Sequence, residues 1–342
     1  MGVALKDLII RKEIKIEDLK GKVLVVDSYN VLYQFLTTIR QRDGSLLTDS
    51  KGNVTSHLAG LFTRTTNLMR RGLKLVFVLD GEVPELKKEE RMRRKEVKKV
   101  AKKNYEIAKK RKDLAEMRKY AVRTTVLTDQ MIEDAKELIA ALGLPMVQAP
   151  SEGEAQAAYM VNKGDAYAAV SQDFDSLLFG APRLVQNLTI SARRKMPGVL
   201  SYRTVKPCII NLAENLNTLK IDQDHLIALG MLIGTDYNVG GIKGIGPKNA
   251  LKLVKLFEND FDGLFKHVHW ENFFDVRWQD VFYMFKRVPV EKKYKIKFQK
   301  VDVERILHLL CEKHDFGKER VFQILKKFKA EEDKKQKSLV DF

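Results

Sequence analysis

The stretch Lys22–Asp27, with the sequence KVLVVD, is a short run of aliphatic and β-branched residues that ends in an acidic side chain. The same pattern returns at Lys74–Asp80, KLVFVLD, and at Ala166–Asp173, AYAAVSQD, and a helical pattern follows each run. Short apolar strands that alternate with helices are typical of a parallel sheet covered on both faces. The sequence therefore predicts the α/β class, with a central, twisted and mainly parallel sheet and helices on both faces.

Acidic residues stand where these predicted strands end. Asp27 and Asp80 close the first two runs, and Asp173 and Asp175 follow the third. In open α/β sheets the functional groups gather at the carboxyl ends of the strands. We therefore expect these four carboxylates to lie together.

Three more acidic residues join this set. Residues 149–155, APSEGEA, contain Glu152 and Glu154, and Asp236 follows later. Carboxylates brought together repel one another, and cations would make their convergence tolerable. Mg²⁺ and Mn²⁺ favour oxygen ligands, and two such ions can promote an in-line phosphoryl displacement. The predicted metal ligands are Asp27, Asp80, Glu152, Glu154, Asp173, Asp175 and Asp236.

Two alternative interpretations apply to these motifs. Ser151-x-x-Glu154 is also the pattern of a capping box, in which both side chains bond to amides at the start of a helix. Asp173-Phe-Asp175 is similar to the aspartate pair of enzymes that form an aspartyl phosphate. In those enzymes the nucleophile follows the first strand, and there this chain has Asp27-Ser-Tyr without a second aspartate. A phosphatase is therefore the minor alternative.

The chain is strongly basic, and the excess charge is concentrated in one stretch. It has 62 Lys and Arg against 45 Asp and Glu, a formal net charge of +17, which indicates a polyanionic partner such as nucleic acid or an anionic membrane. Residues 87–123 hold 17 of the basic and 6 of the acidic residues, without Gly or Pro. We predict a long helix that contacts nucleic acid, with a solvated charged face as the alternative. A separate helix should begin after Thr128 and stop at Gly143.

Several protein classes do not fit this sequence. Cys208 and Cys311 are far apart and lack neighbouring ligands, which disfavours a disulfide framework or a zinc site. Lys6 and Asp7 interrupt the apolar stretch near the start, and no run is long enough to span a membrane. We expect a monomeric cytoplasmic protein without a membrane partner. The absence of a Walker A loop argues against nucleotide fuel.

Six motifs follow one another in a specific order. They are Asp27–Phe35 (DSYNVLYQF), Thr55–Gly60 (TSHLAG), Phe77–Gly81 (FVLDG), Ala149–Ala155 (APSEGEA), Gln172–Ser176 (QDFDS) and Gly234–Tyr237 (GTDY). Together they resemble the archaeal branch of the flap endonuclease family of structure-specific 5′ nucleases, over essentially the whole chain. The resemblance implies a two-metal hydrolysis of DNA at 5′ flap junctions in replication and repair, with 5′–3′ exonuclease activity. Two Mg²⁺ ions would be bound, with Mn²⁺ as a substitute.

The resemblance also implies roles for basic and aromatic residues. Lys87 and Arg94 match positions that contact the scissile phosphate, so with Asp80 and Asp175 they form the predicted catalytic set. Lys87 and Arg94 are seven residues apart, about two helical turns, and should face the metal ions together. Tyr33 matches a residue that stacks near the cleaved end. Further predicted DNA contacts are Arg40 and Arg64.

Residues 242–250, IKGIGPKNA, resemble the helix-two-turn-helix of this family, where backbone amides and K⁺ meet a duplex phosphate. Glycine permits close approach, and Pro247 suits the first turn of a helix whose N-terminus attracts anions. The predicted DNA-contacting glycines are Gly234, Gly244 and Gly246. A tight interhelical turn is the alternative interpretation.

The end of the chain carries a motif of another kind. Gln336, Leu339 and Phe342 have the spacing of the core of a peptide that binds a sliding clamp of the proliferating cell nuclear antigen type. The chain ends where a second aromatic residue would be expected. A sliding clamp is therefore a predicted partner, besides branched DNA with a 5′ flap.

The predicted organisation has five segments. Residues 1–98 and 124–258 form the nuclease regions, the second with the helix-two-turn-helix, and residues 99–123 continue the basic helical arch and the linker. Residues 259–325 are the C-terminal helical part of the same core, and residues 326–342 are the clamp-binding tail. The last third of the chain, from about Ile221, is predicted to be mostly helical.

Two competing functions are weighed against the flap endonuclease. A non-catalytic DNA-junction binder recruited by a clamp would have lost acidic ligands, and all seven are present. A metal-dependent ribonuclease with the same α/β core would lack the basic insertion and the Gly244-Ile-Gly246 turn.

Overall fold

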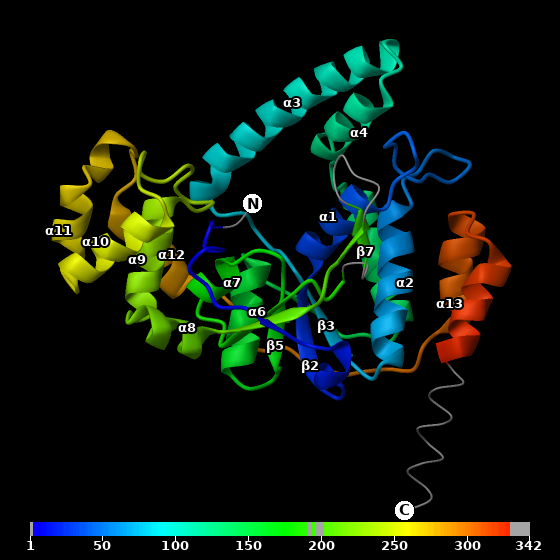
Figure 1. Cartoon of the computed structure of the whole chain (residues 1–342). Coiled ribbons are helices and arrows are strands. Elements are labelled where there is room, and N and C mark those ends of the chain that lie inside the picture. The colour runs from blue at the N-terminus through cyan, green and yellow to red at the C-terminus, as the bar shows by residue number, and fades with distance from the viewer. Residues whose placement is uncertain (1–2, 190–192, 196–201, 329–342) are drawn as a thin grey trace, which may run out of the picture.

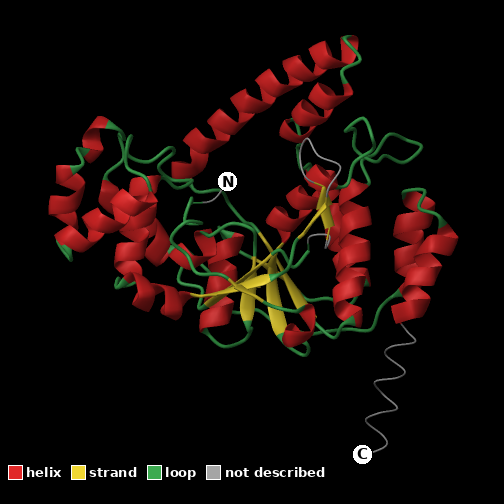
Figure 2. Cartoon of the chain, in the orientation of Figure 1, coloured by secondary structure: helices red, strands yellow, loops and turns green. Residues whose placement is uncertain are grey.

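Seven strands form the central sheet of the computed structural model, which describes residues 3–189, 193–195 and 202–328 (Figure 2). The strand order is β1-β9-β6-β5-β2-β3-β4. The five strands from β6 to β4 pair in parallel, and β9 pairs antiparallel with both β6 and β1. The prediction of a mainly parallel sheet is confirmed. The bounds are β1 Lys12–Glu13, β2 Val23–Asp27, β3 Lys74–Leu79, β4 Met146–Gln148, β5 Ala168–Val170, β6 Arg183–Gln186 and β9 Cys208–Asn211, with β7 Arg193–Lys195 and β8 Tyr202–Thr204 in a separate pair.

Helices cover both faces of the sheet because successive strand residues point to opposite faces (Figure 1). Leu24, Val26 and Phe77 contribute to one core, and Val25 and Val76 contribute to the other. The α1-side core takes α1 Ser28–Thr38, α2 Ser56–Arg70, α5 Asp129–Ala141 and α13 Val303–Leu307. The α6-side core takes α6 Gly153–Asn162, α7 Asp175–Leu178, α8 Leu212–Leu219, α9 Gln223–Ile233, α10 Pro247–Phe257, α11 Phe261–His267 and α12 Trp278–Arg287.

The strand order reverses at β2. From β2 the chain adds β3 and β4 on one side, and it later returns to place β5 and β6 on the other side. The crevice at the carboxyl ends of β2 and β5 is therefore the topological switch point, where ligands bind in open α/β sheets. Asp27 ends β2 at this crevice.

The basic stretch forms a helical hairpin, the arch, that rises above the sheet (Figure 1). A short 3₁₀ turn, η2 Glu85–Lys87, leads into α3 Lys88–Lys110, and α4 Leu114–Arg123 returns towards the body. The prediction of one long helix is wrong, because Lys112 has a φ of 55° and Asp113 caps α4 by accepting the amides of Ala115 and Glu116. Lys87 lies in η2 and not on the same helix as Arg94. Ala101, Ala108, Met117 and Ala121 are buried apolar residues of the hairpin.

The helix expected after Thr128 is confirmed. The Thr128 hydroxyl accepts the amide of Met131 at the start of α5, and Gly143 follows its end with a φ of 72°. The positive φ suits glycine, which stops the helix before β4.

Most of the described part of the last third of the chain is helical, as predicted. Between α12 and α13, however, residues 288–302 form an extended segment, the strap. Pro289 ends the helical pattern, and the alternation in EKKYKIKFQK has the period of an extended chain. The strap passes the N-terminal edge of the sheet, where the Gln299 amide donates to the Gly143 carbonyl. Helical residues 318–328 complete the α1-side core.

A buried polar group, which we call the histidine cluster, joins the loop before α2 to α5 and the C-terminal helices. The members of this cluster are Asp49, Asp134, Lys313 and His314. His314 Nδ1 lies 3.1 Å from Asp49 Oδ2, and its Nε2 lies 3.3 Å from Asp134 Oδ2. Lys313 Nζ donates to Asp134 Oδ1 at 2.7 Å. Each carboxylate in this cluster therefore has a cationic or N–H partner of its own.

None of the helices in the described ranges has the length and apolar character needed to cross a membrane. The predicted clamp-binding residues Gln336, Leu339 and Phe342 lie outside the described residues.

Candidate active site

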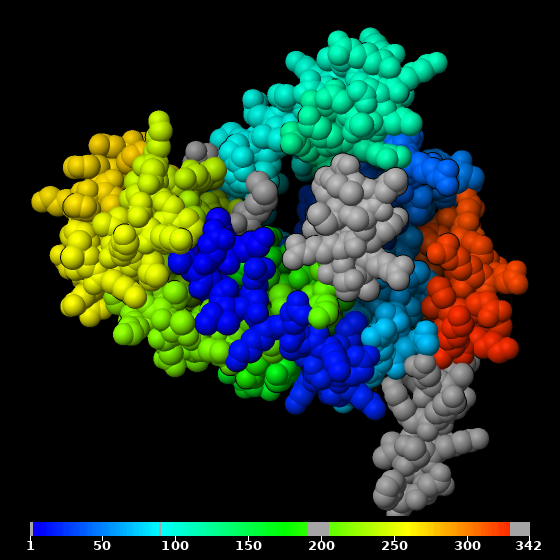
Figure 3. Space-filling model, in the orientation of Figure 1, coloured from blue at the N-terminus to red at the C-terminus, as the bar shows by residue number. Residues whose placement is uncertain are grey.

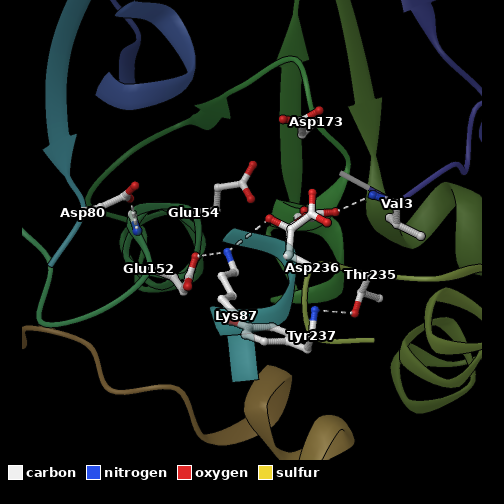
Figure 4. A network of polar contacts seen from close by, with 12 residues as sticks. Val3, Asp80, Lys87, Glu152, Glu154, Asp173, Thr235, Asp236 and Tyr237 are labelled. Atoms are coloured by element: carbon white, nitrogen blue, oxygen red, sulfur yellow. Dashed lines mark hydrogen bonds and ion pairs between the residues drawn. The ribbon is translucent and has the colours of Figure 1, made fainter. Parts of the chain in front are cut away.

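The predicted carboxylates lie at the carboxyl edge of the sheet. Figure 4 shows Asp80, Glu152, Glu154, Asp173 and Asp236, with Lys87 from the foot of the arch among them. Asp27 ends β2 and accepts the amide of Asn30, which makes it the N-cap of α1. Asp80 follows β3 directly and accepts the amide of Gly153 at 2.8 Å. Asp175 opens α7 and accepts the amide of Val3 at 2.7 Å. Backbone amides thus hold three acidic side chains, each of which ends or follows a different strand.

Glu152 and Glu154 belong to the start of α6, but they do not cap it. The Glu152 side chain makes no capping hydrogen bond, and the Ser151 hydroxyl donates to the Glu82 carbonyl at 3.2 Å. Glu154 accepts the hydroxyl of Ser171 at 3.0 Å. The capping-box interpretation is therefore wrong, and both glutamates remain free of that role.

Asn30 is a site residue that the sequence did not reveal. Its Nδ2 donates to Asp173 Oδ2 at 2.9 Å, and its Oδ1 accepts the amide of Gln172 at 3.1 Å. One side chain from α1 thus fixes the loop after β5 against β2. The only signal was its place three residues after Asp27 in the first motif.

Burial and mutual repulsion govern the charge of this site. Burial, and then the Asp80 charge, raise the pKa of Asp27 well above its usual value. Burial and Glu152 raise the pKa of Asp80 to about 6, and burial raises the pKa of Asp175 to about 7, with Asp236 adding to it. The pKa of Glu154 is raised by burial and then by Asp175, Asp27 and Asp173. The carboxylates therefore raise one another's pKa values, because too little positive charge lies among them to balance their negative charge.

Two basic side chains from the foot of the arch supply part of that compensation. Lys87 Nζ lies 2.6 Å from Glu152 Oε2 and 3.4 Å from Asp236 Oδ2. Arg94 Nη2 donates to Asp236 Oδ1 and Oδ2 at 2.9 and 3.0 Å. Burial alone would lower the pKa of Lys87, but Glu152 and Asp236 outweigh it and raise the pKa. Both predicted catalytic cations thus reach the carboxylates, although they belong to different elements.

The donor chemistry fits hard divalent cations, which prefer carboxylate oxygens. In the described part of the chain, however, no group of three or more His, Cys, Asp or Glu side chains is arranged so that it could hold a metal ion. Repulsion among partly uncompensated carboxylates opposes closer packing, and Lys87 and Arg94 engage two of them. The residues fit such cations by type and charge, and they would have to draw closer around them.

The predicted DNA-contacting side chains lie in three places. Tyr33 on α1 is exposed, and Lys98 Nζ of the arch lies 5.6 Å from its ring centroid. Arg40 donates to the Gly44 carbonyl and to the Thr125 hydroxyl, so it joins the loop after α1 to the end of the arch. Arg64 on α2 lines a surface cavity together with Arg71. Only Tyr33 lies beside the arch with its side chain open to solvent.

The glycine-rich turn joins α9 to α10. Gly241 has a φ of 61°, and a Cβ there would lie 2.3 Å from the Ile233 carbonyl, so this turn requires glycine. Gly246 is the N-cap of α10, and Pro247 opens that helix, as predicted. Gly234 ends α9 with a φ of 113°, and Gly244 has a φ of 87°. Thr235 next to Asp236 donates to Asn238 Oδ1 at 2.6 Å, which fixes the loop that carries this carboxylate.

The arch and the body enclose an open space. Figure 3 shows a hollow beneath α3 that opens towards the viewer, with the N-terminal segment below it. Lys102, Lys103, Lys109 and Lys110 are exposed on the arch. A strongly basic element therefore stands over a strongly acidic site.

The chain is similar to proteins of known name and structure. The XPG N-terminal domain matches residues 1–101, and the XPG I-region matches residues 143–236. Flap endonuclease 1 of Pyrococcus abyssi (strain GE5 / Orsay) is 51% identical over 329 residues, which cover 96% of this chain and 94% of that protein. The solved structure of flap endonuclease-1 from Methanococcus jannaschii is 40% identical, with a TM-score of 0.76, and the match covers 98% of this chain and 100% of that chain. The catalytic core of Rad2 in complex with DNA substrate is 23% identical and has the same fold, with a TM-score of 0.70 over 96% of this chain and 100% of that chain.

Proposed function

Because the chain belongs to the flap endonuclease family and is a DNA-cleaving hydrolase, we propose that it cuts branched DNA at 5′ flap junctions. It would act as a monomer in replication and repair, with 5′–3′ exonuclease activity on nicked or gapped duplexes. One observation carries the proposal: seven acidic residues of the family motifs lie in one electrostatically coupled cluster, at the switch point of the sheet and below a basic arch.

The nucleases of this family depend on metal ions, and we assign two Mg²⁺ ions to the acidic cluster, with Mn²⁺ as a substitute. When bound, such ions would activate a water molecule for attack and neutralise charge on the phosphate and on the leaving oxygen. The residues that would hold them are Asp27, Asp80, Glu152, Glu154, Asp173, Asp175 and Asp236.

The other assigned residues bind and orient DNA. Lys87 and Arg94 would turn from Glu152 and Asp236 to the scissile phosphate and stabilise the charge that develops there. Tyr33 would stack near the cleaved end, and Arg40 and Arg64 would contact the DNA backbone. Basic residues of the arch would guide the single-stranded 5′ end.

The turn between α9 and α10 would contact the duplex. Its glycines Gly234, Gly244 and Gly246 would let a phosphate approach the backbone amides, and K⁺ would bind beside them. The start of α10 supports this assignment, since the N-cap residue Gly246 leaves the positive end of the helix without a side-chain cap, and Pro247 suits its first turn.

The test is cleavage of labelled single-flap, double-flap, nicked and hairpin DNA with and without Mg²⁺. We expect incision at the flap junction, dependent on Mg²⁺, and no incision of the hairpin loop. Binding of all junctions without incision would instead support the second candidate function, a non-catalytic junction binder.

A sliding clamp is the proposed protein partner, on the spacing of Gln336, Leu339 and Phe342 alone. Deleting residues 334–342 should weaken clamp binding in a titration and leave the cleavage of free oligonucleotides unchanged. Leu339→Ala should reproduce the loss. Equal clamp affinity of the full and shortened chains would refute the assignment.

A further inference from the structure

Glu90 is a buried carboxylate at the foot of the arch that the proposed function does not use. It lies in the first turn of α3 and is only 4% exposed. Its Oε2 accepts Arg93 Nε at 2.6 Å, and its Oε1 accepts Arg93 Nη2 at 2.8 Å and Arg94 Nε at 2.6 Å. Burial alone would raise the pKa of Glu90, but hydrogen bonds from the two arginines outweigh it and lower that pKa. Glu90 therefore stays charged and holds both guanidinium groups.

Arg94 is held by two carboxylates of different character. Asp236, which accepts both bonds from Nη2, belongs to the acidic cluster. Glu90 holds the Nε end and belongs to the arch itself. When Asp236 serves a metal ion and Arg94 turns to a phosphate, Glu90 is the contact that Arg94 can keep. The Arg94 Nη1 group has no hydrogen bond to any residue within the described ranges, so it is available to an incoming oxyanion.

We propose that Glu90 is a positioning residue for Arg94, and this inference rests on the proposed role of Arg94 at the scissile phosphate. A guanidinium group is planar and presents its N–H donors in a fixed fork. A carboxylate that grips the Nε edge therefore fixes the plane in which the Nη donors point. Without that grip the long side chain would have to be ordered during the reaction, which costs rate and not binding.

Arg93 provides a matched control on the same helix. It donates two hydrogen bonds to Glu90, but it makes none to a carboxylate of the acidic cluster. Arg93→Gln removes one of the two cations that bind Glu90 and leaves the contact between Glu90 and Arg94 in place. If Glu90 only balanced charge at the foot of the arch, this variant would impair cleavage as much as a change at Glu90 does.

The experiment is a double-mutant cycle with Glu90→Gln and Arg94→Ala, measured by single-turnover cleavage of a single-flap DNA at saturating Mg²⁺. We expect Arg94→Ala to slow cleavage by on the order of a hundredfold, as for the loss of one electrostatic stabiliser. Glu90→Gln should slow it by about tenfold, and the double variant should be no slower than Arg94→Ala, because residues that act as a unit are not additive. Arg93→Gln should stay within about twofold, and flap affinity should change little in every variant.

Each failure has a distinct meaning. A double variant slower than Arg94→Ala by the full Glu90→Gln factor would overturn the positioning role. A Glu90→Gln rate equal to that of the unmodified chain would overturn it as well, and the role of Arg94 would stand. If Arg94→Ala cleaved at full rate, the proposed role of Arg94 itself would be wrong. Thermal unfolding reports whether each variant folds. If Glu90→Gln folds poorly, Glu90→Asp replaces it in the test, and because it keeps the charge we expect it to cleave faster than Glu90→Gln.

Discussion

The acidic cluster and the histidine cluster contain the same kind of residue, buried aspartate, in opposite electrostatic states. In the histidine cluster, burial would raise the pKa of Asp49, but hydrogen bonds from Asn53 and His314 outweigh it and lower the pKa to about 2. In the acidic cluster, burial is reinforced by neighbouring carboxylates and the pKa of Asp175 rises to about 7. Each carboxylate of the histidine cluster has a cationic or N–H partner, whereas Lys87 and Arg94 compensate only part of the charge of the acidic cluster.

This difference separates a structural polar cluster from a functional one. A buried carboxylate with cationic and N–H partners stabilises the folded chain without any added ligand. Carboxylates that raise one another's pKa destabilise the chain until something from outside neutralises them, and such perturbed groups mark functional sites. The two clusters should therefore respond in opposite ways to the same kind of mutation.

The largest effect is expected from the acidic cluster. Asp175→Asn, or Asp80→Ala, should lower single-turnover cleavage by on the order of a thousandfold or more, because charge stabilisation by a bound metal contributes several kcal/mol. DNA affinity should change little, because these side chains would hold the metal ions and not the duplex. Asp175→Asn should also raise the stability of the metal-free chain, by about 1–2 kcal/mol, because it relieves repulsion. Turnover of the Asp80 variant at the unmodified rate would contradict the site.

The histidine cluster should show the reverse response. Asp134→Ala removes the carboxylate that lies between Lys313 Nζ and His314 Nε2, while Asp49 still faces His314 Nδ1, and breaking such a pair costs about 3–5 kcal/mol of the free energy of unfolding. Lys313 is partly exposed, so the lower end of that range is expected. Urea unfolding measures the loss, and the cleavage rate of the folded fraction should be unchanged. A variant that stayed stable but lost cleavage would remove the distinction between the clusters.

The two clusters should also have opposite pH dependences. Asp80 and Asp175 have folded-state pKa values of about 6 and 7, above their usual value, so the stability they give is complete at low pH. That stability is lost as the pH rises from about 4 to about 7, in total by a few kcal/mol. The lowered pKa of Asp49 has the opposite sign, and its contribution is lost as the pH falls from about 4 to about 2.

Urea unfolding in a metal chelator, from pH 2 to pH 7, resolves these two dependences. Asp175→Asn should flatten the loss of stability above pH 4 and leave the acid side unchanged. Mg²⁺ added at pH 7 should restore stability to the unmodified chain, because it binds the folded state. Parallel curves for the two proteins would show that Asp175 does not have the raised pKa.

The smallest effect is expected where charge is exposed and belongs to neither cluster. Replacing Lys102, Lys103, Lys109 and Lys110 of the arch by Gln should weaken flap binding and reduce the slope of log affinity against log salt by up to about 0.7 for each phosphate that a lysine no longer neutralises. Cleavage at saturating DNA should change little. The matched control removes four exposed lysines of the strap, Lys292, Lys293, Lys295 and Lys297, and equal slopes for the two variants would refute a specific role of the arch.

The sequence predicted those features that depend on local pattern. The apolar runs at Lys22–Asp27 and Lys74–Asp80 became β2 and β3, since burial on both faces requires a continuous apolar strand. The acidic residues were placed together because parallel strands end at one edge. Local pattern could not reveal Asn30, whose partner Asp173 lies 143 positions away, or Glu90, which was one charge among many in a basic stretch. The break at Lys112 was also missed, because its left-handed conformation carries no Gly or Asn signal.

The path of the strap has a consequence for how the chain is made. The α1-side core begins with β2, α1 and α2, yet it is closed by Ile306, Leu309, Leu310, Val321 and Leu325, which the strap carries back from the opposite layer. On the ribosome, where domains form as they emerge, the first α-helices to be synthesised, α1 and α2, thus belong to the core that is closed last. The α6-side core includes residues only as far as Ile296 and can close earlier. A nascent chain stopped before residue 303 would therefore expose apolar surface in the α1-side core, although α1 and α2 were made early.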